Sequence, residues 1–155
     1  MRIFDSIQAI AVTLWVGTLW STGAMVAPAL FRMIGDRALA GTVAGHLFTV
    51  TAFIGLACGG YLLIAGLFRN RSGSLRQPVF WLVVGMITLV CISQFGIQPV
   101  LAGLREQAYP DSVMQSELAR SFATWHAVAG TLYIVQCTLG LALVVLVIRP
   151  QARKR

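Results

Sequence analysis

Hydrophobic residues occur in four long blocks along this chain and do not alternate with polar ones. The blocks cover roughly residues 7–31, 43–68, 78–101 and 121–148, and none contains Asp, Glu, Lys or Arg between its ends. Crossing about 30 Å of hydrocarbon as a helix takes about 20 residues. The pattern therefore predicts an all-α protein, an integral membrane four-helix bundle that forms a single transmembrane domain over residues 1–155.

The fourth helix is predicted to begin before its apolar block. Ser112 and Gln115 form an S-x-x-Q capping box, in which the serine bonds the first turn and the glutamine bonds back to it. This predicts one unbroken helix over 113–148. Glu117 and Arg120, three residues apart on that helix, are predicted to pair on its outer face.

Composition supports a membrane location. Of the 155 residues, 57% are hydrophobic and 11% are charged, whereas a soluble domain carries about 25% charged residues. The net charge of +7 comes from basic residues at the block ends, which favours lipid headgroups over nucleic acid as the partner. The three cysteines lie in separate apolar blocks without a pairing pattern, and are predicted to be buried free thiols (Cys58, Cys91 and Cys137).

The basic residues also predict the orientation, because Lys and Arg concentrate on the cytoplasmic side. The N-terminus, the second loop and the C-terminal tail carry eight of them (Arg2, Arg69, Arg71, Arg76, Arg149, Arg153, Lys154 and Arg155). The other two loops carry four, offset by four acidic residues (Arg32, Arg37, Arg105 and Arg120 against Asp36, Glu106, Asp111 and Glu117). Both termini are therefore predicted to be cytoplasmic.

The chain contains a half-repeat. A shift of 80 residues places the second block on the fourth without a gap, with His46 on His126. Five further identities follow, at Thr51, Ile54, Gly60, Leu63 and Arg69. "APAL" at 27–30 resembles "QPVL" at 98–101, and each is predicted to close the helix before it. These matches predict two helical hairpins of the same direction, a parallel repeat.

The two histidines are the only ones in the chain and are predicted to lie at one height. Each precedes a cytoplasmic-side arginine by 23 residues, or about 35 Å along a helix, which places both imidazoles near the outer membrane boundary. Each begins a stripe of small and aromatic residues (His126, Gly130, Tyr133, Cys137, Gly140; His46, Val50, Phe53, Ala57, Gly60). Small residues on such stripes let helices approach, so both histidines are predicted to point into the bundle. Gly41-x-x-x-Gly45 and Gly55-x-x-x-Gly59 add further close-contact faces.

Two interpretations of the histidines stay open. Near the same level lie Met25, Gln94 and Gln98. His46 and His126 as ligands would suit a haem b iron, or copper with Met25 as a third ligand. Alternatively, the imidazoles hydrogen-bond to the glutamines or the backbone and tie the hairpins together. Arg120 completes this outer polar cluster and is a possible entry point for an anionic ligand.

No hydrolytic or nucleotide-binding motif is present: the chain lacks a Walker loop, G-x-S-x-G and H-E-x-x-H. We therefore expect no catalytic residues, and the leading interpretation is a non-catalytic accessory or transport component. The alternative is a haem- or copper-binding redox protein. Besides the bilayer, partners include a second copy of the chain or other membrane proteins.

Three stretches together resemble a known family. "GTLWSTGAMVAPALFRMIGDRALAGTVAGHLF" (17–48), "QFGIQPVLAGLRE" (94–106) and "SFATWHAVAGTLYIVQ" (121–136) resemble the bacterial four-helix membrane proteins called domain of unknown function 4149. That family is similar to animal transmembrane protein 205 and, more distantly, to CopD copper-resistance and HemJ protoporphyrinogen-oxidase proteins. The resemblance implies a four-helix fold in a bacterial inner membrane, and its wider group implies copper or haem handling. HemJ-like proteins pair an intramembrane His with a Lys, whereas the only lysine here is Lys154 in the tail.

Overall fold

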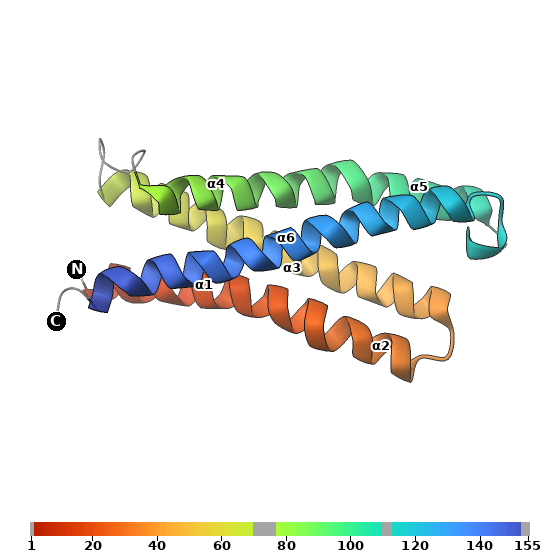
Figure 1. The fold of residues 1–155 in the computed structure, drawn as a ribbon, viewed down its shortest axis with the longest axis horizontal. Coiled ribbons are helices and arrows are strands. Elements are labelled where there is room, and N and C mark those ends of the chain that lie inside the picture. Colours follow the sequence, from red (N-terminus) through yellow and green to blue (C-terminus); the bar gives the residue numbers. More distant parts are fainter. Residues whose placement is uncertain (1, 70–76, 110–112, 153–155) are drawn as a thin grey trace.

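The protein is an all-helical bundle (Figure 1). The computed structural model describes residues 2–69, 77–109 and 113–152, and these contain no strand. The elements in chain order are α1 (Arg2–Ser21), the π-helix η1 (Thr22–Val26), α2 (Ala27–Met33), α3 (Arg37–Arg69), α4 (Pro78–Cys91), the π-helix η3 (Ile92–Ile97), α5 (Gln98–Ala108), the short 3-10 helix η4 (Val113–Gln115) and α6 (Ala119–Ala152).

Four stretches are long and apolar enough to cross a membrane, which confirms the predicted four-helix membrane bundle. They are Ile3–Met33, Arg37–Phe68, Pro78–Ala108 and Ala119–Val147. Large hydrophobic side chains point away from the bundle on every span, among them Phe68, Phe95 and Ile134. In a membrane-spanning protein, such residues contact lipid.

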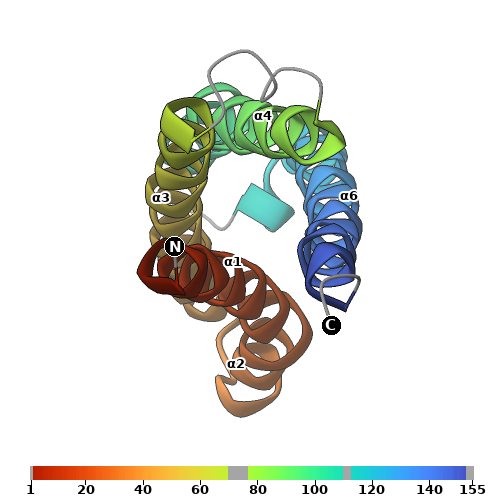
Figure 2. The same cartoon turned by 90° about the vertical axis from the view of Figure 1, so that its left-hand side faces the viewer.

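The helices form a ring in which α1 packs against α3, α3 against α4, α4 against α6, and α6 back against α1 (Figure 2). We call the end that holds the N-terminus, the C-terminus and the α3–α4 connection the terminal end (Figure 1). The opposite end, with the α2–α3 and α5–α6 connections, is the loop end. Because α1 and α4 both run from the terminal end to the loop end, the two hairpins have the same direction, as predicted.

The two π-helices occupy corresponding places in the two hairpins. Each precedes a proline, and the backbone N–H of the residue before that proline donates to a carbonyl five residues back: Ala27 to Thr22, and Gln98 to Ser93. Proline has no N–H and its ring crowds the carbonyl four residues earlier, so a wider turn relieves both conflicts. A shift of 71 residues along the sequence aligns the two prolines and the π-helices that precede them.

The prolines do not close their helices, and that prediction is wrong. After η1 the chain continues as α2 to Met33, and after η3 it continues as α5 to Ala108. Proline is well tolerated in the first turn of a helix because its missing N–H would have no partner there. Each π-helix gives the following segment a new first turn.

The residue-by-residue overlay at a shift of 80 does not survive in the structure. Thr51 is 4% exposed, whereas its counterpart Thr131 is exposed. Leu143 is fully buried, whereas Leu63 is only half-buried. The alignment at a shift of 80 therefore pairs buried positions of one helix with exposed positions of the other. The two corresponding π-helices are better evidence of a repeat.

The hydrophobic core fills the terminal half of the ring. Trp15, Met86 and Leu143 are each 0% exposed and come from α1, α4 and α6. The rest of the cluster lies around them (Ala11, Val12, Val16, Leu19, Cys58, Val83 and Val90). The cysteines are free thiols, and Cys58 is buried while Cys91 and Cys137 are partly buried.

The glycine motifs of α3 differ in what they contact. A Cβ on Gly55 would collide with the indole of Trp15. One on Gly59 would lie 2.8 Å from Ile87 Cγ1 and 2.9 Å from Trp15 Cη2. A Cβ on Gly41 or Gly45 would meet nothing within 4 Å. Only the second predicted motif is therefore a close-contact face.

Two helix starts differ from the predicted ones. Asp36 caps α3, because its Oδ1 accepts hydrogen bonds from the N–H groups of Ala38 (2.8 Å) and Leu39 (3.3 Å), so this helix begins earlier than residue 43. The helix expected from residue 113 begins at Ala119, after a separate 3-10 turn. Ser112 of the predicted capping box lies outside the described residues.

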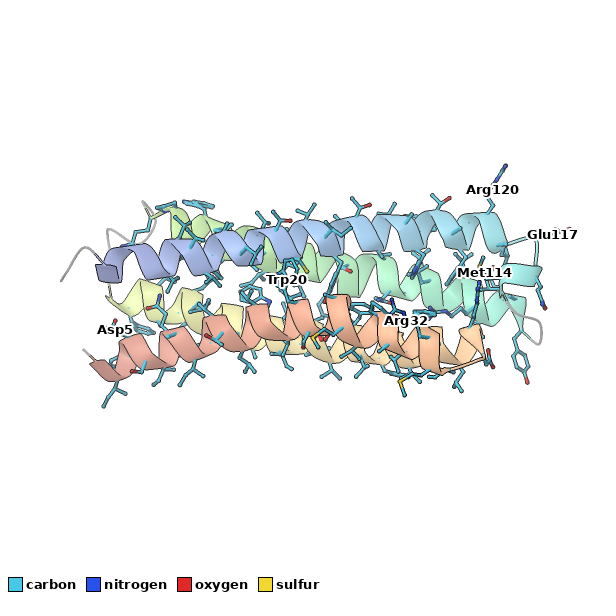
Figure 3. The ribbon with its side chains drawn as sticks, turned by 60° about the horizontal axis from the view of Figure 1, so that its bottom comes forward. Asp5, Trp20, Arg32, Met114, Glu117 and Arg120 are labelled. Atoms are coloured by element: carbon cyan, nitrogen blue, oxygen red, sulfur yellow. The ribbon has the colours of Figure 1, made fainter. Side chains whose placement is uncertain are left out.

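The later start of α6 explains why the predicted Glu117–Arg120 pair is wrong. Glu117 lies before the helix, so the two side chains do not share a helical face. They point in different directions (Figure 3), and no ion pair joins them in the described part of the chain.

The Trp15–Gly55 contact predicts a difference between two glycines of one helix. Gly55→Ala should lower the free energy of unfolding by about 1–3 kcal/mol, because the buried indole has no room to move. Gly45→Ala should be neutral or slightly stabilising, since alanine is the better helix former. Thermal unfolding in detergent measures both, and equal effects would contradict the packing described.

Candidate functional site

A layer of polar side chains crosses the bundle near the middle of the four spans. Its members lie in the central third of their helices and come from both hairpins (Thr22, Thr49, Thr51, Gln94, Tyr133 and Gln136). Hydrocarbon offers polar groups no partners, so each of them must be satisfied within the protein or by something bound to it.

Two hydrogen bonds of this layer join neighbouring helices. The hydroxyls of Thr22 and Thr51 lie 3.0 Å apart in the buried interface between η1 and α3. Gln94 on η3 donates from Nε2 to Thr49 Oγ1 at 3.5 Å, at the α3 side. Both bonds involve a π-helix, so the widened turns lie where the polar side chains meet.

Tyr133 closes the seam between the first and last helices. Its hydroxyl donates to the backbone carbonyl of Leu19, and its ring lies so close to Gly23 that a Cβ there would collide with it. The ring edge also meets Phe48 of α3, with centroids 4.9 Å apart and planes at 80°. A second bond runs from Trp20 Nε1 to the Cys137 carbonyl at 3.3 Å (Figure 3).

Gln136 is the unusual member of the layer. It lies one helical turn beyond Tyr133 toward the terminal end and is 4% exposed. Neither its Nε2 nor its Oε1 has a hydrogen-bond partner among the described residues. A buried amide without partners costs several kcal/mol in an apolar environment, so this side chain is suited to bind water or a polar ligand.

The bundle differs on the two sides of this layer. Toward the loop end, α2 packs on α3 and diverges from α6 (Figures 1 and 2). Toward the terminal end, the fully buried Trp15, Met86 and Leu143 separate Gln136 from a small cavity of about 50 Å³. All four spans line that cavity, with Gln8, Val12, Gly66, Phe80 and Leu143 among its residues.

His126 lies in the loop-end half and is exposed. Its ring stacks on Phe122, one turn earlier in α6, with centroids 5.9 Å apart and planes at 11°. The guanidinium carbon of Arg105 also lies over the Phe122 ring, 5.2 Å from its centroid. A cation, a phenyl ring and an imidazole thus form one stack between α5 and α6.

His46 lies on a different kind of surface. It is exposed together with Val50 (55%) and Phe53 (53%), on the face of α3 opposite Thr51 and Gly55. The prediction that this stripe points into the bundle is therefore wrong, because Gly55 and Gly59 make the close contacts of α3. On α6 the prediction holds for Tyr133 and Gly140, which pack against α1, but not for the exposed His126.

The members of the predicted outer cluster differ in exposure. Met25 is 70% exposed, Gln98 is half-buried, and Arg120 points away from the bundle (Figure 3). Among the residues that the structure describes, no group of three or more His, Cys, Asp or Glu side chains could hold a metal ion. The haem and copper sites stay predictions, and the outward face of His46 does not fit a site shared with His126.

Sequence analysis missed Gln136, the threonines of the polar layer and Arg105. Gln136 had a usable signal, since it is the lone amide inside the fourth apolar block. Arg105 had no such signal in the sequence, because its partner Phe122 belongs to another helix.

An unpartnered amide predicts an unusual response to substitution. Gln136→Leu should raise the free energy of unfolding by about 1–3 kcal/mol, because an apolar side chain of similar size removes the desolvation cost. Thr51→Val is the matched control: it leaves the Thr22 hydroxyl unpartnered and should be destabilising by about 0.5–2 kcal/mol. A destabilised Gln136→Leu protein would show that the amide has a structural partner.

Comparison with known proteins gives one match. The family model described as "Domain of unknown function (DUF4149)" matches residues 10–110, from within α1 to the end of α5. Neither a search of curated proteins nor a search of solved structures finds a match. The family model covers more than half of the chain and confirms the resemblance stated for residues 17–48 and 94–106. The chain therefore belongs to the domain of unknown function 4149 family.

Proposed function

We propose that this protein is a non-catalytic membrane transport component that carries a small polar ligand between its two hairpins. The observation that carries the proposal is Gln136, a buried amide with no partner in the described protein, at mid-depth of an apolar bundle. An intramembrane polar group that costs stability is a functional group by default. Its position marks the ligand site.

The paired π-helices support this assignment. Transporters built from repeats place their sites near the bilayer midplane, where corresponding helices of the two halves are interrupted. Here η1 and η3 are those interruptions, and the polar layer lies between them. A ligand at Gln136 would have the hydroxyls and amide of that layer within the same third of the membrane.

The groups on the two sides of Gln136 supply the elements of a pathway. On the loop-end side, Tyr133 and Phe48 form the barrier beneath the divergence of α2 from α6. On the terminal side, the fully buried Trp15, Met86 and Leu143 form a second barrier, next to the 50 Å³ cavity. Relative movement of the two hairpins about the Tyr133 seam would expose Gln136 to either side.

The setting of this function follows the charge pattern. We place both termini, and hence the terminal end, in the cytoplasm of a bacterial inner membrane, because eight of the twelve basic residues belong to the N-terminus, the second loop and the C-terminal tail in the sequence. The loop end then faces outward. No contact in the described bundle favours the alternative redox function with His46 and His126 as ligands.

Thiol labelling tests whether water reaches the site. Cys58, Cys91 and Cys137 are first replaced by Ser or Ala, and Gln136→Cys is introduced for reconstitution into vesicles. A membrane-impermeant methanethiosulfonate reagent should label it at least about tenfold faster than Ile134→Cys, because thiols react as hydrated thiolates. Ile134 is the matched control, two residues away on α6 and 68% exposed toward lipid.

The two outcomes separate a transporter from a static bundle. Labelling of Gln136→Cys that exceeds the Ile134→Cys rate supports a path between the hairpins. Equal, negligible labelling of both thiols would mean that Gln136 never meets water, and the transport proposal would be abandoned.

A further inference from the structure

We propose that the ligand carries an anionic group, a phosphate or a carboxylate, which binds Arg105 at the loop end of the bundle. This inference rests on the proposed function and names the chemical class of its ligand. Its core is the stack of Arg105, Phe122 and His126, which joins α5 to α6.

Arg105 is a half-buried cation whose hydrogen-bonding capacity is unused in the described protein. Its guanidinium carbon lies over the Phe122 ring, and its N–H groups donate no hydrogen bond to another described residue. No carboxylate of the described residues lies within ion-pair distance of it, although the exposed Glu106 is its chain neighbour. Partial burial strengthens a charge-assisted hydrogen bond, and the planar fork of arginine matches phosphate and carboxylate oxygens.

Phe122 and His126 hold the guanidinium in place. A stacked arginine loses less conformational freedom on binding than a free one, so the anion meets a pre-formed donor edge. His126 continues the stack by one turn toward Tyr133, and its imidazole supplies a further hydrogen-bond donor in that direction.

The surroundings of the stack attract an anion. From the other hairpin, Arg32 projects from α2 toward the side of α5 and α6 (Figure 3). Arg105 itself lies near the end of α5, in the loop-end half of the bundle. Arg120 carries the same charge as Arg105 and lies two residues before Phe122 in the sequence. Its side chain, however, extends outward from the bundle (Figure 3).

Binding measurements on the purified full chain in a zwitterionic detergent test this site. The probes are inorganic phosphate, acetate and dihexanoyl phosphatidylglycerol, with dihexanoyl phosphatidylcholine as the neutral control. Isothermal titration gives the affinity, and thermal unfolding gives an independent readout, because a ligand that binds only the folded state stabilises it. Arg105→Gln should weaken anion binding by at least about tenfold, and Arg120→Gln should change it by less than about twofold.

Each outcome decides whether Arg105 forms an anion site. Saturable binding of phosphatidylglycerol alone identifies the anion as a lipid headgroup, whereas binding of free phosphate or acetate identifies a soluble anion; both support the site if Arg105→Gln weakens them. Arg105→Lys controls for folding, since it keeps the charge and should retain part of the affinity. No anion binding to the native chain, or equal losses in Arg105→Gln and Arg120→Gln, overturns the inference.

The result is also separable from the proposed function. Anion binding without labelling of Gln136→Cys would leave a loop-end anion site on a closed bundle. Labelling of Gln136→Cys without anion binding would leave a pathway whose ligand is neutral or cationic.

Discussion

The seam between α1 and α6 is the contact on which the rest of the bundle depends. Three of the four neighbouring helix pairs follow one another along the chain. The fourth pair, α1 and α6, is joined by packing and by two hydrogen bonds that Tyr133 and Trp20 donate to backbone carbonyls. In hydrocarbon the hydrophobic effect gives helices no reason to associate, so close packing and such bonds decide which faces meet. Without this seam the two hairpins would be joined on one side only.

The seam also divides the molecule into two unlike halves. On its terminal side, large side chains fill the ring around Trp15, while Gly55 and Gly59 let α3 approach. On its loop side, the π-helix η1 redirects the chain, and α2 follows α3 away from α6. The same widened turns that accommodate Pro28 and Pro99 place polar side chains at the boundary between the halves. A tightly packed end and an end where the helices diverge are consistent with the proposed movement of one hairpin against the other.

Sequence patterns predicted the class of fold, because the length of an apolar block reports directly on the thickness of the bilayer. They failed where neighbouring helices decide the outcome. His46 and His126 have similar flanking stripes and are predicted to share a height. The close contact of Gly55 nevertheless turns the His46 stripe outward, while Tyr133 turns the inner part of the other stripe toward α1. Pro28 and Pro99 were expected to end their helices, because no sequence pattern indicates that a π-helix precedes them.

Electron paramagnetic resonance at the two histidine positions tests most directly whether the hairpins part at the loop end. Nitroxide labels on His46→Cys and His126→Cys, in a background without the native cysteines, occupy similar heights on equivalent helices, so each controls for the depth of the other. The account predicts that the label at 126 collides mainly with a water-soluble nickel chelate and the label at 46 mainly with oxygen dissolved in lipid. Equal lipid accessibility at both positions would contradict it, because water would then not reach the loop-end side of α6 between the hairpins.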